Sequence, residues 1–492
     1  MHRSLTFLVG ELTYDAQRQH AYGMRFLGAV ALLLVACTKP NPVVCCTSPA
    51  DCNSLGAMET SRPCTDGFVC INHECSTAPP SDAAPACTMD SDCPTTAPHC
   101  TTTNVCVECT TSSQCSPSSP VCDSDTSSCR ACAADSECSS NACDTNTGLC
   151  ISASNVLYAS PNGADAASCT QTDPCSITHA IASVDSGHAT VKLAAGTYTP
   201  QLSITGKTFI LHGVGATLAP NQTGATTAVT VGVGTHLKII GLSITASSGS
   251  GIDCGPSDPN ATPVPSLELD NMNIDTEQFV LLAYPCYLVV RQSHFNARTV
   301  SPAAFIASPS TATFDRCVFE GGGVESAGAG ASVRVSNSLF FNQMSEQMTG
   351  SPGPLSGKNF GTATAGEAYA SFSTFIGSSL LCGSGLPACA GGTGDGVCID
   401  NSILTSTSGD AVQGAGCSVS HSIAMPQAAA LNGSSNLVNV DPLFVGGGSF
   451  ALKSSSPAVD AADPNAVDNV DLVGTLRPQG PRNDIGAYEY KP

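Results

Sequence analysis

The sequence has no tryptophan, and aromatic residues make up only 5% of its 492 residues. Charged residues are also scarce, at 12%, about half of what is usual in soluble proteins. With 46 glycines besides, this composition indicates a β-rich, turn-rich extracellular protein. It argues against a cytosolic helical enzyme.

Positively charged residues are scarcer than negatively charged ones. Lysine and arginine number 18, against 39 aspartates and glutamates, which gives a formal net charge of −21. A polyanion is repelled by a surface of the same sign, and nucleic-acid binding depends on neutralising phosphates. The sequence therefore predicts no nucleic-acid partner and no electrostatic binding to anionic lipid surfaces.

The apolar run near the N-terminus is too short to cross a membrane. Residues 26–36, "FLGAVALLLVA", are eleven apolar residues, whereas a spanning helix needs about 20. Arg25 supplies a positive charge in front of the run, as in a secretory signal peptide. We therefore predict a signal peptide over 24–36 that starts at Met24, with residues 1–23 an over-extended N-terminus.

The signal is followed at once by Cys37, and Leu34–Cys37 ("LVAC") resembles the lipobox of bacterial lipoproteins. The resemblance implies diacylation of Cys37, which becomes the mature N-terminus, with residues 37–44 as anchor and tether. Lipid chains of this kind hold a protein on the membrane without spanning it. The expected location is the bacterial cell envelope, at the outer membrane or cell surface. An ordinary signal with a chance cysteine is the alternative.

Cysteines are concentrated in the next part of the chain: 18 of 28 lie between Cys45 and Cys150. A Cys-rich module (45–75) and a Pro/Ala/Ser linker (76–86) precede three units of four cysteines, in which the units start 22 and 23 residues apart. Together these repeats occupy residues 87–150. Their cysteines are Cys87, Cys93, Cys100 and Cys106; Cys109, Cys115, Cys122 and Cys129; Cys132, Cys138, Cys143 and Cys150.

The repeats have almost no apolar residues to bury, so disulfides must replace a hydrophobic core. A zinc ribbon is the alternative, because two CxxC pairs, Cys106–Cys109 and Cys129–Cys132, have nineteen residues between them. Two further cysteines within that interval, an even count and an oxidising compartment favour disulfides. The array resembles the Cys-rich stalk modules of bacterial surface lipoproteins, which implies a protease-resistant spacer; a small ligand-binding module is the alternative.

A second repeat begins after residue 230, typified by "RVSNSLFF" (334–341). Each copy has an inward residue, two intervening residues, a small or apolar residue, an outward residue and another inward one. Copies start 20 to 35 residues apart, at 238, 268, 289, 313, 334, 369, 398 and 418. The first inward column is Ile239, Leu269, Val290, Phe314, Val335, Ala370, Ile399 and Val419; the last is Ile244, Ile274, Phe295, Phe319, Phe340, Phe375, Leu404 and Ala424.

The second intervening position is Gly, Asn or His in five of the eight copies, residue types that tolerate a left-handed backbone. We therefore predict a corner there, at which two strands meet while both still face one core. Repeats of this length form solenoids whose coils stack as parallel strands. The small residues of the fourth position would then form an internal ladder: Ser293, Cys317, Ser338, Ser373, Ser402 and Ser422.

This pattern resembles the right-handed parallel β-helix of pectate-lyase-like proteins, over roughly residues 155–490. Residues 157–199 and 440–490 resemble the two ends of such domains in bacterial proteins. The resemblance implies an all-β chain with a β-helix domain over 151–492, capped at both ends. Ile177, Ile181 and Val184 form an apolar helical stripe suited to plugging one end, and Cys169 and Cys175 are expected to close a local loop by a disulfide.

Catalytic signatures of such proteins are missing. The paired aspartates, "GHG" and "RIK" of polygalacturonases and the RxPxxR pattern of one pectate lyase class do not occur, and no carboxylate pair suited to glycosidase chemistry is evident. One constellation remains at the first corner position: Asp270, Arg291 and Asp315, on coils about 4.8 Å apart. Arg316, Asn273 and His294 are expected close by.

Two interpretations of this constellation stay open. In a polysaccharide lyase, Asp270 and Asp315 would hold Ca²⁺ against a uronate and Arg291 would abstract the C5 proton. Alternatively, the alternating signs form a ladder that avoids like-charge stacking, which is the favoured interpretation. Ca²⁺ is the one cofactor that the sequence suggests.

Other polar residues and cysteines give weaker indications of a functional site. The run Asp460, Asp463, Asp468 and Asp471 would hold Ca²⁺ or form turns, with turns favoured. His188, His212 and His421 lack metal-ligand spacing and are expected at the surface or at corners. Cys254 is expected to pair with Cys286, and two further pairs would form among the four cysteines from Cys382 to Cys417. Cys317 is left over as a buried, inert thiol.

Three functions are compatible with this sequence. The first is a surface lipoprotein whose β-helix binds extended carbohydrate, or another surface polymer, without cleaving it. The second is a Ca²⁺-assisted polysaccharide lyase, and the third a structural or adhesion protein with a protein partner.

Overall fold

The computed structural model describes residues 68–71, 74–77, 87–145, 147–221, 227–255, 262–298, 302–328, 330–341, 355–358, 367–377, 379–381, 397–407, 409–413 and 417–492. The expected signal peptide, Cys37 and the tether lie outside these residues, as does the Cys-rich module apart from strands β1 (Phe68–Ile71) and β2 (Glu74–Thr77). Within the described residues, no helix has both the length and the hydrophobicity that a membrane crossing requires.

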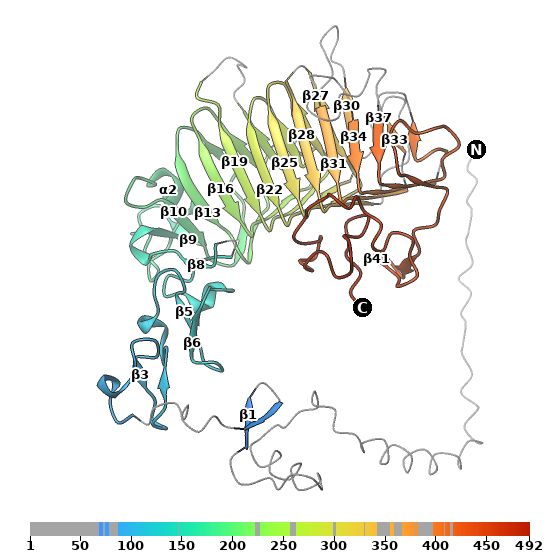
Figure 1. Ribbon diagram of the computed structural model, residues 1–492. Helices are drawn as coiled ribbons and strands as arrows, with labels where there is room; N and C mark the ends of the chain where they lie inside the picture. Colours follow the sequence, from blue (N-terminus) through green and yellow to red (C-terminus); the bar gives the residue numbers. More distant parts are fainter. Residues whose placement is uncertain are drawn as a thin grey trace, which may run out of the picture. The chain divides into compact units, whose positions relative to one another are not determined.

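Three sheets of parallel strands form a right-handed parallel β-helix, as predicted (Figure 1). The first sheet contains β9 (Val156–Ala164), β10 (Thr190–Leu193), β13 (Thr208–His212), β16 (His236–Ile240), β19 (Ser266–Asp270), β22 (Tyr287–Arg291), β25 (Thr311–Asp315), β28 (Ser332–Ser336), β31 (Glu367–Ser371), β34 (Val397–Asp400) and β37 (Cys417–Ser420). The second contains β11 (Gly196–Tyr198), β14 (Ala216–Leu218), β17 (Ser243–Ala246), β20 (Asn273–Thr276), β23 (His294–Ala297), β26 (Val318–Glu320), β29 (Leu339–Phe341), β32 (Thr374–Gly377), β35 (Ile403–Ser406), β38 (Ile423–Met425) and β39 (Leu437–Val438).

A third sheet completes each coil and was not predicted from the sequence. It contains β12 (Leu202–Ile204), β15 (Val229–Val231), β18 (Ile252–Cys254), β21 (Leu281–Ala283), β24 (Ala304–Ala307), β27 (Val324–Ala327) and β30 (Leu355–Lys358), while β33 (Leu380–Leu381) pairs with β36 (Val412–Gln413). Strands of two to four residues show too little alternation to stand out in a sequence.

The eight predicted corners all adopt the left-handed backbone conformation. Their φ angles lie between 46° and 65°, at Gly241, Asn271, Gln292, Arg316, Asn337, Phe372, Asn401 and His421. The interruption of the strand alternation is therefore a turn from the first sheet to the second. It does not shift the strands against one another, because the coils on both sides of it stay in register.

One hydrophobic core contains both inward columns. Every residue of the two columns is at most 2% exposed and belongs to the same buried cluster. Phenylalanines stack along it: the ring centroids of Phe319 and Phe340 are 4.4 Å apart, and those of Phe340 and Phe375 are 4.7 Å apart. Coil stacking therefore places like residues on like residues around a single interior, as the repeat predicts.

The small residues of the fourth position form the expected ladder. Amide N–H groups donate to the hydroxyl of the next coil, from Cys317 to Ser338 at 3.0 Å and from Ser338 to Ser373 at 3.2 Å. The pattern continues to Ser402 and Ser422. Each of these serine hydroxyls donates in turn to the carbonyl two residues before it. These polar groups are thereby satisfied inside the solenoid.

Both ends of the β-helix have additional structure. Helix α2 (Ile177–Ala182) buries Ile177 and Ile181 in the main core, with Val184 packed against it, which agrees with the predicted helical stripe. After β39, the C-terminal segment (residues 440–492) includes the antiparallel pair β40 (Phe444–Gly446) and β41 (Ser449–Leu452). It then folds back over the corners of the last coils, where it forms a second apolar cluster with Phe372, Ile403 and Ile423.

The Cys-rich repeats share one local design. Each begins with a 3₁₀ helix, η1 (Asp90–Asp92), η2 (Ser112–Gln114) or η3 (Asp135–Glu137), and continues into a two-stranded sheet. These sheets are β3 (His99–Cys100) with β4 (Cys106–Val107), β5 (Val121–Asp123) with β6 (Ser128–Arg130), and β7 (Cys143–Asp144) with β8 (Leu149–Cys150). A fourth 3₁₀ helix, η4 (Ala153–Asn155), leads into β9.

The disulfides of the repeats interleave, which the sequence did not reveal. The first cysteine bonds the third and the second bonds the fourth, in the pairs Cys87–Cys100, Cys93–Cys106, Cys115–Cys129, Cys132–Cys143 and Cys138–Cys150. Cys109 and Cys122 are disulfide-bonded as well. Each bridge closes a loop of 11 to 14 residues, which stabilises a small fold by about 3 kcal/mol in the chain-entropy treatment.

The chain divides into two compact units. One contains the residues up to Thr110 together with Asp123–Ser128, and the other contains Thr111–Cys122 together with Cys129–Pro492. The third Cys-rich repeat thus belongs to the same unit as the β-helix.

Candidate functional site

The sequence-predicted residues Asp270, Arg291 and Asp315 lie at equivalent positions on three successive coils. Asp270 is aligned with Arg291, and Arg291 with Asp315, at the ends of β19, β22 and β25. They form a charged ladder on the outer face of the first sheet. Asn273 and His294 lie beyond the corner, on the second sheet, where His294 Nδ1 is 3.3 Å from Asn273 Oδ1.

Ion pairs hold the first half of this ladder. Arg291 Nη1 lies 3.3 Å from Asp270 Oδ1 and 3.5 Å from Glu268 Oε2. On the other side, Lys238 Nζ lies 3.3 Å from Asp270 Oδ2 and 2.8 Å from Asp144 Oδ2. Burial alone would lower the pKa of Lys238, but the carboxylates of Asp144 and Asp270 outweigh it and raise that pKa. Lys238 therefore stays protonated and neutralises its neighbours.

Asp315 has partners of its own. Arg316 Nε donates to Asp315 Oδ2 at 3.0 Å, and the Ser336 hydroxyl donates to Oδ1 at 2.8 Å. The side-chain amide of Asn337 donates to the same oxygen at 3.2 Å. The carboxylate is therefore bound from its own coil and the next one.

A Ca²⁺ site at Asp270 and Asp315 does not fit this arrangement. The Asp270 side chain is only 2% exposed and lies between two cations. Asp315 is two coils away with Arg291 between them, about 10 Å along the stack. In the part of the chain that the structure describes, the clusters of three or more Cys, His, Asp or Glu with suitably close ligand atoms contain cysteines only.

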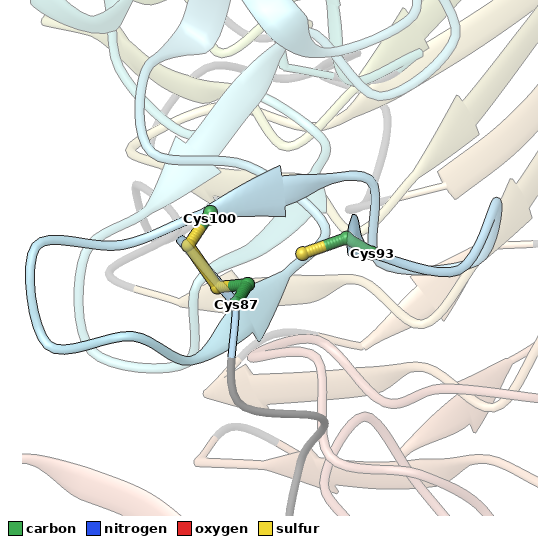
Figure 2. A group of neighbouring side chains, drawn as sticks. All are labelled: Cys87, Cys93 and Cys100. Carbon is green, nitrogen blue, oxygen red and sulfur yellow. A yellow bond between two sulfur atoms is a disulfide. The ribbon is translucent and has the colours of Figure 1, made fainter. Parts of the chain in front are cut away.

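Those cysteine clusters have no thiolate to offer a metal. Figure 2 shows one of them, where Cys87 and Cys100 are joined by a disulfide, and Cys93 is bonded to Cys106. The two CxxC pairs of the zinc-ribbon alternative are likewise consumed, because Cys106, Cys109, Cys129 and Cys132 are all disulfide-bonded. The repeats are disulfide modules.

The prediction that His212 lies at the surface or at a corner is wrong, because its side chain is completely buried. The third Cys-rich repeat covers it: His212 Nε2 lies 2.9 Å from the Cys143 carbonyl and 3.2 Å from Asp135 Oδ1. Its Nδ1 lies 3.1 Å from Lys192 Nζ, and Lys192 also contacts the Asp135 carboxylate. Because an ammonium only donates, Nδ1 must accept and Nε2 carries the proton.

Asp135, in the third Cys-rich repeat, contacts both Lys192 and His212 of the first sheet, and these three residues form the joint between the repeat and the β-helix. Burial would raise its pKa, but hydrogen bonds from His212, the Cys143 N–H and Lys192 outweigh that effect and hold the pKa far below its usual value. The carboxylate is therefore ionised at any ordinary pH. The other two histidines lie as expected: His188 is exposed beside Asp185, and His421 occupies a corner.

A second group on the first sheet was missed by sequence reasoning. The Tyr369 hydroxyl donates to Asp400 Oδ2 at 3.4 Å, and His421 Nδ1 lies 4.0 Å from Asp400 Oδ1 and 3.8 Å from Asp463 Oδ2. Burial raises the pKa of Asp400, with Asp463 adding to the effect. The position of Asp463 depends on the C-terminal segment, which folds back over 60 residues later, so no local pattern would have revealed the group.

The acidic run of the C-terminal segment forms turns and contacts with the coils. Asp471 Oδ1 accepts from the Thr475 N–H at 2.6 Å, and Asp463 Oδ1 from the Asn465 N–H at 2.9 Å. Asp460 accepts from the Arg482 N–H, and Asp468 accepts from the side-chain amide of Asn337 at 3.0 Å. Their oxygens are engaged within the protein.

Asp484, in the same segment, makes the stability of the protein depend on pH. Burial raises its pKa to about 6, although the N–H groups of Asp460 and Tyr490 donate to it. In the unfolded chain the group titrates near 3.8. As pH falls from 6 toward 3.8, only the folded state binds this proton, so folding gains stability in that interval.

We therefore expect wild-type protein to gain thermal stability between pH 7.5 and 5 relative to Asp484→Asn, which keeps a hydrogen-bond acceptor without the charge. Comparing the two proteins removes the contributions of other acids. Thermal unfolding followed by circular dichroism at several pH values measures the difference. Parallel curves for the two proteins would contradict the assignment.

The remaining cysteines within the described residues are disulfide-bonded or buried. Cys169–Cys175 and Cys254–Cys286 are disulfides, as predicted. Cys398 and Cys417 are disulfide-bonded, while Cys382 and Cys389 lie outside the described residues. Burial raises the pKa of Cys317 to about 12, so this thiol is inert at physiological pH.

A cavity of about 590 Å³ opens beside the charged ladder. Its floor is the outer face of β10, β13, β16 and β19, and its wall is the third Cys-rich repeat with the residues that follow it, up to Asn155. Lys238 and Glu268 belong both to the cavity and to the ion-pair network. Alternation along β16 and β19 would have placed both side chains outward, but the wall could not be foreseen.

Three of the solved structures that match this chain are a pectate lyase, an endo-xylogalacturonan hydrolase and an alginate lyase mutant. The pectate lyase Pel9A is 14% identical with a TM-score of 0.49, over 69% of this chain and 97% of that one. Endo-xylogalacturonan hydrolase from Aspergillus tubingensis is 13% identical, with a TM-score of 0.29 over 57% and 99%. A mutant of the PL6 family alginate lyase AlyGC is 10% identical, with a TM-score of 0.24 over 57% and 53%.

No protein-family model matches the chain, and no curated protein matches it. At such low identities and TM-scores, these matches do not show the chemistry of this chain. The chemistry must therefore be argued from the residues of this chain.

Proposed function

We propose that the outer face of the first sheet binds an extended carbohydrate polymer without cleaving it. One observation carries the proposal: the acids and bases of the charged ladder neutralise one another, with Arg291, Asp270, Glu268 and Lys238 linked at 3.5 Å or less. Residues engaged in this way stiffen a surface, but they are not poised to transfer protons.

A lyase needs a base that loses its proton. An arginine guanidinium is protonated at any pH that a protein tolerates, and Arg291 Nη1 lies within 3.5 Å of two carboxylates, those of Asp270 and Glu268. The aspartates that would bind Ca²⁺ in that mechanism are held by cations or by neighbouring coils. The geometry therefore favours binding over elimination.

The same face offers a repeating set of contacts. Ser266, Tyr287, Thr311 and Ser332 occupy the same strand position on four successive coils, at a spacing of about 4.8 Å. Tyr287 is 54% exposed and supplies an aromatic ring among the hydroxyls. A periodic row of hydroxyl groups suits a polymer whose own hydroxyls repeat.

The proposal includes the location. An exported protein anchored through lipid on Cys37 would carry the β-helix at the cell envelope, where extended glycans occur. The abundance of disulfides in the described repeats is consistent with an oxidising compartment.

The test incubates the full chain and its Arg291→Ala variant with polygalacturonate, alginate and neutral glycans in Ca²⁺. Unsaturated uronate is monitored, and retention on the immobilised glycans is measured in parallel. Arg298→Ala is the matched control, since Arg298, which directly follows β23, also pairs with an aspartate, Asp275, at 2.6 Å, but beside the second sheet. We expect retention and no product.

Other outcomes have clear meanings. Product that disappears in Arg291→Ala and persists in Arg298→Ala would establish the lyase. An absence of both product and retention would favour a protein partner for this surface.

A further inference from the structure

The cavity beside the charged ladder is built by two parts of the chain that the sequence separates. Its wall includes Thr147, Leu149 and Ser152, whereas its floor includes Thr208 and His236. Both parts belong to the same compact unit. The buried contacts of Asp135 with Lys192 and His212 fix the wall in place, so the cavity is a preformed feature.

The lining mixes apolar surface with groups that hydrogen-bond to hydroxyls. Leu149, on the wall, is 39% exposed despite its apolar side chain. Across from it lie hydroxyl-bearing and imidazole side chains on the floor, and His236 Nδ1 is 2.6 Å from the Ser266 hydroxyl. Pockets of a few hundred Å³ with this mixture are typical small-molecule and sugar sites.

The charges around the cavity do not favour an anion. Asp144, Asp270 and Glu268 outnumber the cations Lys238 and Arg291, and each cation already lies within 3.5 Å of two carboxylates. A uronate carboxylate would therefore meet uncompensated negative charge. A neutral sugar would not.

The cavity is continuous with the hydroxyl row of the first sheet, because Ser266 belongs to both. A polymer lying on that row crosses the coils and reaches the cavity at Ser266. The third Cys-rich repeat would then contact this polymer from the side.

We propose that this cavity is a subsite for a neutral polysaccharide and that the third Cys-rich repeat forms one of its walls. The inference rests on the proposed function of the first sheet. It adds the class of glycan, the direction of the polymer across the coils, and the participation of the disulfide module.

The test compares variants that fill the cavity from opposite sides in the full chain. Leu149→Arg alters the wall and Thr208→Trp the floor; both side chains are exposed, so the fold should tolerate them. Val105→Arg is the matched control, because Val105 also directly precedes the fourth cysteine of its repeat and is 38% exposed, against 39% for Leu149. Circular dichroism and unfolding midpoints confirm that all three proteins fold.

Binding is measured by affinity electrophoresis with soluble β-glucan, xylan and mannan, and with polygalacturonate as the anionic comparison. We expect at least one neutral glycan to bind wild-type protein, tenfold or more weakly for Leu149→Arg and Thr208→Trp, and within twofold of wild type for Val105→Arg. Polygalacturonate should bind more weakly than that neutral glycan.

The outcomes separate this inference from the proposed function. If a glycan binds wild-type protein and both cavity variants equally, the subsite is refuted while binding by the first sheet stands. If polygalacturonate binds more tightly than every neutral glycan, the glycan class is refuted. If wild-type protein retains no glycan at all, both proposals fail.

Discussion

Replacing Asp135 with alanine is expected to lower the free energy of unfolding of the β-helix by about 3–5 kcal/mol, the usual result of removing one partner of a buried ion pair. The change leaves the Lys192 ammonium, whose side chain is 9% exposed, and the fully buried His212 without their carboxylate. Chemical denaturation followed by circular dichroism measures the loss.

The repeat design supplies an internal control. Asp90 occupies the equivalent position in the first repeat, where its carboxylate accepts from the Cys100 N–H at 2.7 Å, just as Asp135 accepts from the Cys143 N–H at 2.9 Å. Asp90→Ala therefore removes the same hydrogen bond within a repeat without touching Lys192. Equal effects of the two variants on unfolding of the β-helix would show that the contacts of Asp135 with Lys192 and His212 do not stabilise it.

Phe340→Ala should be as damaging, at about 3–5 kcal/mol, because it empties the middle of the phenylalanine stack. Phe340 is fully buried, and its ring lies between those of Phe319 and Phe375, at 4.4 and 4.7 Å. Neighbouring coils cannot close around the gap, since hydrogen bonds along the strands fix the coil spacing. Equilibrium unfolding in denaturant gives the size of the effect.

Phe341 is the natural comparison for this prediction. It follows Phe340 directly, is only partly buried, and its ring centroid is 5.6 Å from that of Phe450 in β41. Phe341→Ala should cost less than half as much. A larger loss for Phe341→Ala than for Phe340→Ala would mean that the inward column is misassigned.

The sequence predicted the coils well because stacking repeats one residue requirement at a fixed position. Val335, Phe314 and Ile399 share an interior because each must fill the same place in its own coil. The left-handed conformation of the corners does not require Gly, Asn or His, because Gln292, Arg316 and Phe372 also adopt φ angles of 46° to 54°. The stacked strands on both sides impose a conformation that costs such residues about 1–2 kcal/mol.

The candidate site was only half predictable. The alignment of Asp270, Arg291 and Asp315 followed from counting coils, but their ion pairs involve Glu268 and Lys238, which begin their copies at a position for which the repeat sets no requirement. The contacts of Asp144 and Asp463 depend on segments that fold back from either end of the β-helix. Such docking produces no repeating pattern in the sequence, because it depends on the shapes and charges of surfaces that exist only in the folded protein.

The C-terminal segment also determines where the β-helix is free to change its length. It binds specific coils, through Asp468 to Asn337, Ala487 to Thr374 and Gly486 to Asn401. Inserting or deleting a whole coil between Asn337 and Asn401 would displace these partners by one strand spacing, about 4.8 Å. Among the described residues, those between Asp270 and Asn337 take part in none of these docking contacts, so an engineered chain with a longer binding face should receive its extra coil there.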